Sequence, residues 1–363
     1  MSCRRVGSLI TAGLIIVGGL ITAAPTTAKG HLDVLLDGLA SPKGIVAGPK
    51  SVFVAQGWFG PPGPVLEYSL TGRARGTARA VTDPAALADL TVTPDGAGWA
   101  IAYPSENSVV LVREASEGAP IEPILDFNAY QAADPDPFDK DVPANPGETN
   151  PNGLAPLPNN DVLVADAAGN DLIRVSPDGT ARTVARWRLQ DVGTDHLGDP
   201  SLPPTLPAEA VPTTVAIGRD GWAYVGQLVG FPAKPGSAHI WRVNPNATNV
   251  LCSVSAPNAN CSVWKSGFTS IFDIAFNRSN GTLYVYEIAK NGWLTFEPGF
   301  SNGGHFPPAV LLEVKGKKIR ELAPGELSEP GGVAVGKDGS IYVTDGAIGI
   351  FASHGRLLKV RGS

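Results

Sequence analysis

Short apolar runs alternate with turn-forming residues along almost the whole chain. The pattern is clearest from Asn150 to Ala185, where the runs are Gly153–Leu157, Val162–Ala165, Leu172–Val175 and Ala181–Ala185. Turn sequences such as Pro177-Asp178-Gly179 separate the runs and are typical of β-hairpins. Because the runs are nearly continuous in apolar residues, they indicate strands that are covered on both faces. We therefore predict a four-stranded up-and-down sheet that needs neighbouring sheets on both sides.

The second strand of this unit recurs six times. Its cores are Phe53-Val54-Ala55, Ala100-Ile101-Ala102, Leu163-Val164-Ala165, Tyr224-Val225-Gly226, Tyr284-Val285-Tyr286 and Tyr342-Val343-Thr344. The intervals between central residues range from 47, between Val54 and Ile101, to 63, between Ile101 and Val164. Six units of four antiparallel strands predict an all-β fold, a six-bladed β-propeller.

The two ends of the chain each provide an incomplete unit. The segment His31–Leu36 reads as a strand without a hairpin partner, and the last unit stops after its third strand, Arg356–Val360. A missing outer strand would leave an exposed sheet edge. We therefore predict that His31–Leu36 completes the last blade, so that an N-terminal strand closes the ring.

Residues 1–28 have the features of a secretory signal peptide. Arg4 and Arg5 precede the apolar run Val6–Ala24, and Thr26-Thr27-Ala28 ends in a small residue that a signal peptidase accepts. A membrane anchor is the alternative, since the run is nearly long enough to span a bilayer. Small residues and Pro25 follow the run at once, which favours cleavage. We expect a secreted, extracellular protein whose residues 29–363 form one propeller domain.

Composition and charge narrow the range of partners. The 43 Gly and 33 Pro suit many short strands, and the net charge is −6 without a basic patch in the sequence. Nucleic acid is therefore not an expected partner. We expect a monomer that binds a small molecule or an extracellular partner. We expect no contact with the membrane after signal cleavage.

Two cysteines remain once Cys3 has left with the signal peptide. Cys252 and Cys261 are an even count in an exported chain, which favours a disulfide between them. They flank the tip of a long hairpin between the predicted strands His239–Val243 and Ser262–Ser266. A redox-active pair is the less favoured alternative.

Strand polarity predicts where a binding site would lie. The residue before each first strand and the residue after each second strand meet at one end of the ring, because these strands are antiparallel. Polar side chains at this end of the axial channel are a candidate ligand-binding site. The predicted ligand-binding residues are Asn152, Asp166, Gln227, Glu287, Glu329 and Asp345. The alternative is that such strand-end residues only cap the following turns.

Two long inserts and several aromatic residues are expected at the same end. The insert Tyr130–Thr149 carries four aspartates among prolines, and the insert Gln190–Glu209 carries His196 between two aspartates. Long connections of this kind often form binding rims. The aromatic residues after second strands could form a stacking wall for a ligand or could pack the inserts down. They are Trp58, Phe59 and Phe231.

Four segments give the chain a family resemblance, namely Asn150–Asp178, Ala210–Ile217, Tyr224–Leu228 and Gly267–Ala275. Their motifs PNGL, VLVADA, NDLIRV, AVPT and YVGQLVGFP resemble those of the ScyD/ScyE-like secreted propellers, named for the gene cluster of a cyanobacterial sunscreen pigment. The resemblance implies an exported propeller and little about chemistry. More distantly, Asn152-Gly153-Leu154 is similar to a motif of NHL-type and gluconolactonase-type propellers.

The distant resemblance raises the question of a metal. Gluconolactonase-type propellers hold a divalent cation with a Glu, two Asn or similar residues and an Asp, and Asn152 matches one of these positions. Lys43 stands where that family has Glu, and Ser270 also departs from the pattern. A cofactor is therefore not firmly implied, although oxygen ligands of this kind would suit Ca²⁺ or Mg²⁺.

Two functional hypotheses remain. No nucleophile motif and no phosphate-binding loop is present in the sequence, so the catalytic residues are unknown. The favoured hypothesis is a secreted propeller that binds a small molecule, glycan or protein partner at the polar channel end. The alternative is an extracellular hydrolase or lactonase, lyase or cyclising enzyme of secondary metabolism, with or without a divalent metal.

Overall fold

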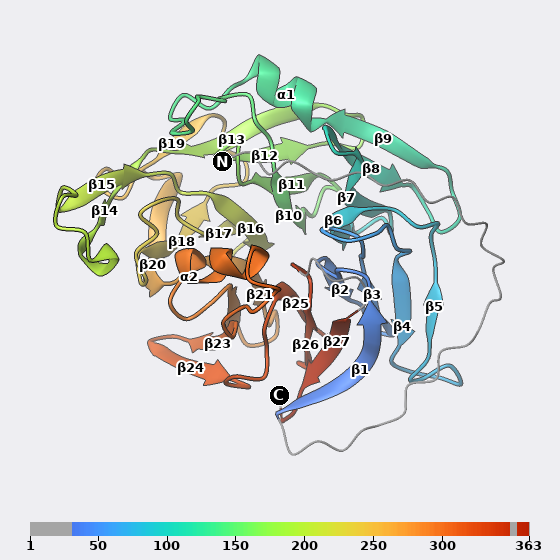
Figure 1. Ribbon diagram of the computed structural model, residues 1–363. Coiled ribbons are helices and arrows are strands. Elements are labelled where there is room, and N and C mark those ends of the chain that lie inside the picture. The colour runs from blue at the N-terminus through green and yellow to red at the C-terminus, as the bar shows by residue number, and fades with distance from the viewer. Residues whose placement is uncertain (1–30, 349–353, 363) are drawn as a thin grey trace.

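Six four-stranded antiparallel units are arranged around a central axis in the computed structural model, which describes residues 31–348 and 354–362 (Figure 1). The innermost strands of the six blades surround the axis, and each following strand lies farther out. The predicted six-bladed β-propeller is confirmed. The predicted signal peptide lies outside the described residues.

The first three blades follow the sequence order. Blade 1 consists of β2 (Ile45–Ala47), β3 (Ser51–Val54), β4 (Leu66–Ser69) and β5 (Ala78–Ala80). Blade 2 consists of β6 (Leu87–Val92), β7 (Gly98–Ser105), β8 (Ser108–Glu114) and β9 (Ile121–Asp126). Blade 3 consists of β10 (Pro151–Pro156), β11 (Val162–Asp166), β12 (Asp171–Val175) and β13 (Ala181–Trp187).

The last three blades repeat the arrangement. Blade 4 consists of β16 (Pro212–Ile217), β17 (Ala223–Gln227), β18 (Ala238–Val243) and β20 (Cys261–Phe268). Blade 5 consists of β21 (Ile271–Phe276), β22 (Leu283–Glu287), β23 (Val310–Lys315) and β24 (Lys318–Leu322). Blade 6 consists of β25 (Pro330–Val335), β26 (Ile341–Asp345), β27 (Gly355–Val360) and β1 (Leu32–Leu39).

The first strand of the chain closes the ring, as predicted. β1 pairs antiparallel with β27, and the register places Leu32 opposite Val360 and Val34 opposite Leu358. Figure 1 shows β1 in blue beside β27 in red, with the described ends of the chain in one blade. Leu36 is 4% exposed and packs into an apolar cluster shared by blades 6 and 1.

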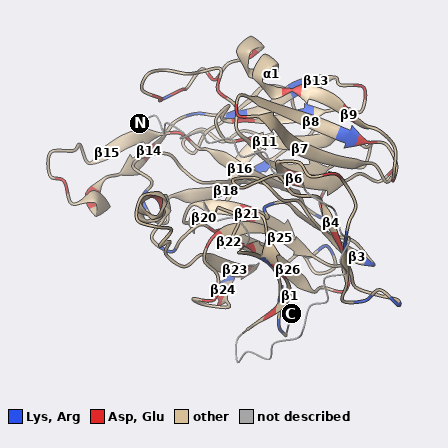
Figure 2. Cartoon of the chain, turned by 45° about the vertical axis from the view of Figure 1, so that its right-hand side comes forward, with Lys and Arg blue, Asp and Glu red and all other residues tan. Residues whose placement is uncertain are grey.

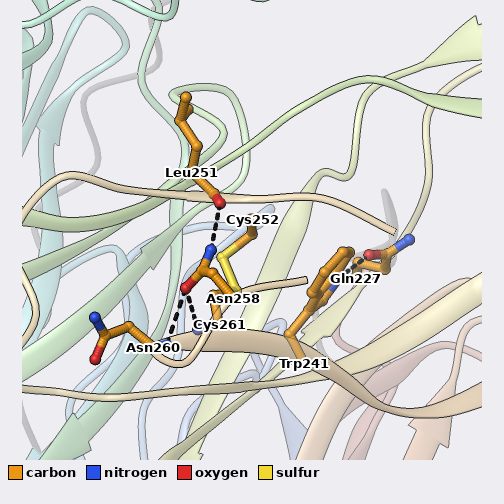
Figure 3. The surroundings of a disulfide bond; sticks show 7 residues. All are labelled: Gln227, Trp241, Leu251, Cys252, Asn258, Asn260 and Cys261. Atoms are coloured by element: carbon orange, nitrogen blue, oxygen red, sulfur yellow. Dashed lines mark hydrogen bonds between the residues drawn. A yellow bond between two sulfur atoms is a disulfide. The ribbon is translucent and has the colours of Figure 1, made fainter. Parts of the chain in front are cut away.

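The disulfide joins two blades and not only the tip of a hairpin. A short strand, β19 (Val250–Cys252), pairs in parallel with β13 as a fifth strand of blade 3. Cys252 at its end is bonded to Cys261, the first residue of β20 in blade 4. The side chain of Asn258 orders the loop between them by donating to Leu251 O and accepting from Cys261 N, both at 2.9 Å (Figure 3). The predicted disulfide is confirmed, and the fifth strand is an addition that the repeat pattern does not contain.

Three inserts add structure to the blades. The first forms helix α1 (Phe127–Ala133) and a loop, and the second forms a hairpin of β14 (Gln190–Gly193) and β15 (Thr205–Ala208) around the turn η1 (Asp195–Leu197). The third, which the sequence analysis did not identify, forms α2 (Trp293–Phe296) and η2 (Glu297–Phe300). None of the helices in the described part of the chain is long and apolar enough to cross a membrane.

Buried apolar side chains fill the space between neighbouring blades. Trp187 of blade 3 and Trp241 of blade 4 have ring centroids 6.3 Å apart within one such cluster. This explains the nearly continuous apolar runs, because each sheet is covered on both faces by its neighbours. In the view of Figure 2, Lys and Arg are scattered among Asp and Glu over the blades.

Candidate functional site

The innermost strands share an irregularity where they enter the ring. In blades 2 to 5 the register between first and second strands shifts by one residue at this point, so that one extra residue bulges out. The extra residues are Ala88, Asn152, Thr213 and Phe272. A bulge re-aims the side chains beside it. Asp89 and Asp273 directly follow the bulged residues of blades 2 and 5, and Lys43 lies just before β2.

Lys43 places a buried ammonium group at this end of the channel. The residue is 5% exposed, and Nζ donates a hydrogen bond to the backbone oxygen of Asn152 across the ring. Burial lowers the pKa of Lys43, while the charges of Asp89 and Asp273 oppose that shift. No carboxylate of the described residues lies within 4.0 Å of Nζ, so the ammonium has only one protein acceptor.

Asp89 and Asp273 lie on the innermost strands of blades 2 and 5, on opposite sides of the ring. Asp89 accepts from the backbone N–H of Leu90 and, across the blade boundary, from that of Leu154 at 2.7 Å. Asp273 likewise accepts from Val333 N of blade 6 at 2.7 Å. Inner strands have an unpaired edge toward the axis, and an unpaired buried N–H is costly. The two carboxylates accept hydrogen bonds from backbone N–H groups of this edge, which no neighbouring strand can reach.

Burial changes the proton affinity of both carboxyl groups. It raises the pKa of Asp89 to about 7, with Lys43 opposing and Asp273 adding to the shift. Burial also raises the pKa of Asp273, which a hydrogen bond from Thr214 Oγ1 at 2.6 Å opposes. The buried Lys43 and the half-buried Asp89 and Asp273 thus form one charged group in the channel, and we call it the axial triad.

Glycine allows the inner strands to approach one another closely. A Cβ atom on Gly153 would lie 2.6 Å from Thr214 Cα, and one on Gly44 would lie 2.7 Å from Asp89 Cα. These distances are shorter than any real contact of a Cβ atom, so only glycine fits at these positions. The channel is therefore narrow at the level of the axial triad.

Aromatic side chains cover the triad from the loop side. The Lys43 ammonium lies 5.2 Å from the Trp58 ring centroid and 5.5 Å from that of Phe272, within reach of cation–π attraction. Both rings belong to one apolar cluster with the third insert, whose helix α2 is orange in Figure 1. We call this cluster the aromatic cap, and it consists of Trp58, Phe272, Trp293, Phe296, Phe300 and Phe306.

All six predicted ligand-binding residues lie at this end of the blades and are buried. Their exposed fractions range from 0% for Asp166 and Gln227 to 6% for Glu329. Asp166 accepts from Asn150 N at 2.7 Å and Gly169 N at 3.1 Å, and so holds the entry loop of its own blade. Asp345 does the same in blade 6, where it accepts from Ser328 N at 2.9 Å.

The other predicted residues also form hydrogen bonds with protein groups in their own part of the ring. Glu287 accepts from Thr269 N at 2.7 Å, and Gln227 accepts from the indole N–H of Trp241. Glu329 pairs with His354 at 3.0 Å, while its second oxygen has no partner in the described part of the chain. Only Asn152, through its backbone oxygen, contacts the axial triad directly.

Burial is the main cause of the raised pKa values of Asp166, Glu287 and Glu329. Burial raises the pKa of Glu287 to about 7 and also raises that of Asp166. For Glu329 the charge of Asp345 adds to the effect of burial. Glu329 and Asp345 are therefore brought together, whereas Asp166 and Glu287 act on separate blades. The structure shows the capping contacts, and direct contact with a ligand stays a prediction.

The residues at the axis do not fit a divalent cation. Lys43 places a positive charge against Asn152, the position that matches the metal motif, and the Asn152 amide donates to Asn150 O at 2.9 Å. No cluster of three or more His, Cys, Asp or Glu with metal-site geometry occurs within residues 31–348 and 354–362. We derive no chemistry through a metal.

Sequence reasoning named Lys43 and Trp58 but missed Asp89, Asp273 and the rest of the aromatic cap. A signal for the two aspartates was present, since each interrupts an apolar first strand, in Leu87-Ala88-Asp89-Leu90 and in Ile271-Phe272-Asp273-Ile274. The exposed Phe59 and Phe231, at 53% and 56%, remain available on the surface.

Comparisons with known proteins agree with the fold. No family model matches the sequence, and no curated protein matches it. Among solved structures, a glucose dehydrogenase is 13% identical with a TM-score of 0.55, covering 92% of this chain and 99% of its own. A putative gluconolactonase is 14% identical with a TM-score of 0.52, covering 94% and 98%. The PQQ-bound aldose sugar dehydrogenase of Streptomyces coelicolor is 14% identical with a TM-score of 0.50, covering 93% and 99%. At these identities the likeness shows the six-bladed propeller fold alone.

Proposed function

We propose that this protein is a secreted propeller that binds a small molecule at the loop end of its central channel. A glycan or protein partner is a less suitable occupant, because the axial triad lies in a narrow channel beneath the aromatic cap. The ScyD/ScyE-like resemblance, which stays a prediction, agrees with export, and so does the disulfide between Cys252 and Cys261.

The position of Lys43 carries the proposal. A buried ammonium with a single protein acceptor is poorly compensated, since burying a charge is costly unless it is paired and hydrogen-bonded. A ligand with a carbonyl, hydroxyl or carboxylate oxygen would supply the missing acceptor. The rings of Trp58 and Phe272 beside the ammonium would contact the apolar body of the same ligand.

An enzyme is the second candidate, and Asp89 is the observation in its favour. A carboxyl group with a pKa of about 7 has the proton affinity that a general acid or base needs at neutral pH. The solved structures of dehydrogenases and of a putative gluconolactonase share the fold with this chain, and their support for an enzyme extends no further than the fold. Against it, both oxygens of Asp89 already accept backbone hydrogen bonds. Binding is therefore the function that the geometry supports best.

Metabolite capture tests the proposal. The purified full chain and its Lys43→Met variant are incubated with spent culture medium of the source organism, and the retained molecules are identified by mass spectrometry. We expect a molecule that the wild type retains and the variant does not. Lys318→Met, on the exposed strand β24, is the control for loss of one positive charge.

Two outcomes would contradict the proposal. One is equal retention by the wild type and Lys43→Met, and the other is loss of binding in Lys318→Met as well. Trp58→Ala provides a second probe of the site if Lys43→Met does not fold, because Trp58 is only partly buried. A retained molecule that is released with a changed mass would support the enzyme instead.

A further inference from the structure

A cavity lies at the seam where the ring closes, on the face opposite the axial triad. It has a volume of about 530 Å³ and lies between blade 6 and blade 1. Its walls come from the turn after β2 at Gly48 and Pro49, the turn after β4, the turn before β26 and the outer strands β27 and β1. In a propeller these turns lie away from the end where the first strands begin. The size suits a small organic ligand.

Three cations surround this cavity, and they lie far apart in the sequence. They are Arg75 after β4, Lys337 before β26 and Lys359 on β27. Within the described residues none of them forms an ion pair or a side-chain hydrogen bond. Asp338 is the one acidic residue of the lining, and its carboxylate accepts from Ser340 N and Ser340 Oγ of its own turn. These hydrogen bonds, and then the nearby charge of Lys359, lower the pKa of Asp338. The lining therefore carries a net charge of about +2 on a protein of net charge −6.

Two tyrosines add polar and aromatic surface between the cations. Lys359 Nζ lies 5.8 Å from the ring centroid of Tyr342. Burial raises the pKa of Tyr68, and the nearby charge of Arg75 opposes that shift. The Tyr68 hydroxyl has no hydrogen-bond partner among residues 31–348 and 354–362. Leu35 and Leu70 supply apolar surface beside these rings.

We propose that this cavity, the seam pocket, binds a phosphate ester of a small organic molecule. Three cations that have no carboxylate within 4.0 Å among the described residues, together with the free Tyr68 hydroxyl, can donate to the oxygens of a tetrahedral oxyanion. A net charge of about +2 complements a dianion, whereas a carboxylate or a sulfate ester carries one negative charge. The tyrosine rings and the leucines contact the organic body. The ligand would span blades 6 and 1 and so stabilise the closed ring.

Calorimetric titration at constant ionic strength tests the seam pocket with defined probes. Phenyl phosphate is compared with inorganic phosphate, phenyl sulfate, benzoate and phenol, and glucose 6-phosphate distinguishes a sugar body from an aromatic one. We expect phenyl phosphate or glucose 6-phosphate to bind at least about tenfold more tightly than inorganic phosphate, benzoate and phenol. Binding should strengthen between about pH 5 and pH 7, because the phosphate ester gains its second negative charge near pH 6.

Charge-matched variants locate the binding. The double variant Arg75→Gln/Lys359→Gln should lower the affinity for the tighter phosphate ester by about tenfold or more. Lys317→Gln/Lys318→Gln removes two exposed positive charges at the start of β24 and should leave the affinity unchanged. The wild type should also gain thermal stability with the ester, and the pocket variant should not.

Four results would overturn the inference. The first is equal affinity of the two double variants, which would mean general attraction of anions. The second is benzoate or phenol binding as tightly as the esters, and the third is no heat of binding and no thermal shift with any phosphate. Tighter binding of phenyl sulfate than of phenyl phosphate would likewise reject a phosphate-ester site. Arg75 is exposed and Lys359 is partly exposed, so the pocket variant should fold, and its circular dichroism spectrum checks this.

Discussion

Gly169 makes room for the side chain of Gln131, because a Cβ atom at position 169 would lie 2.1 Å from Gln131 Nε2. The amide of Gln131, on helix α1, passes through this gap and donates to Asp166 Oδ2 at 3.2 Å and to Asp171 Oδ2 at 3.3 Å. All three of these polar residues are fully buried. A glycine of blade 3 thus allows the first insert to dock on two carboxyl groups.

Gly169→Ala tests this docking. The added methyl group would displace Gln131 and remove its hydrogen bonds to buried carboxyl groups. We expect a loss of unfolding free energy of about 1–3 kcal/mol, measured by urea denaturation. Gly147→Ala is the matched control, since its Cβ would lie 3.7 Å from Ala132 Cα, an ordinary contact beside the same helix. Equal stability of the two variants would mean that the helix does not depend on this gap.

Asp171→Asn tests the cost of a buried carboxyl group. Burial, and then the charge of Asp166, raise the pKa of Asp171 well above its usual value. An acid with a raised pKa in the folded state loses stability as the pH rises above its unfolded pKa of about 4, by up to about 1.4 kcal/mol per pH unit. The substitution should therefore raise the unfolding free energy at pH 7 more than at pH 5.

Urea denaturation at both pH values provides the measurement for Asp171. The exposed Asp83, which forms no side-chain hydrogen bond within the described part of the chain, gives the control Asp83→Asn. A pH dependence in Asp171→Asn that stays parallel to that of the wild type would contradict the prediction. So would a decrease in stability at pH 7.

Removing the disulfide should loosen the outer edges of blades 3 and 4. In a Cys3→Ser background, Cys252→Ala/Cys261→Ala should lower the unfolding free energy by about 2–3 kcal/mol, the chain-entropy value for a loop of this length. β19 should lose hydrogen-exchange protection first, because it is held to blade 3 by one short parallel pairing. Two free thiols in the unfolded, unreduced Cys3→Ser protein would show that the bond does not form.

Leu36→Ala tests ring closure. Leu36 is 4% exposed at the seam, so its truncation should cost about 2–4 kcal/mol in thermal or urea unfolding. Val34, two residues away on β1, is 37% exposed, and Val34→Ala should cost less than about 1 kcal/mol. If both substitutions had the same small effect, β1 would not contribute its buried face to the closure of the ring.

The sequence by itself determined the architecture. Apolar runs and Asp-Gly turns depend on local physics, because strand period and turn geometry involve residues that are neighbours along the chain. The repeat therefore predicted six blades. The lone segment His31–Leu36, and a last unit that stops after its third strand Arg356–Val360, predicted the closure. The even count of cysteines and the short separation of Cys252 and Cys261 predicted their bond, but not that it joins two blades.

The tertiary structure alone decided the chemistry at the axis and at the seam. Bulges and close strand approach bring Lys43 between Asp89 and Asp273, and both effects depend on how blades pack against one another. Arg75 and Lys359 meet only because the last blade is completed by the first strand, which places residues from opposite ends of the chain around one cavity. No local sequence pattern predicts the parallel pairing of β19 with blade 3, because this pairing needs the free edge of a strand in a neighbouring blade.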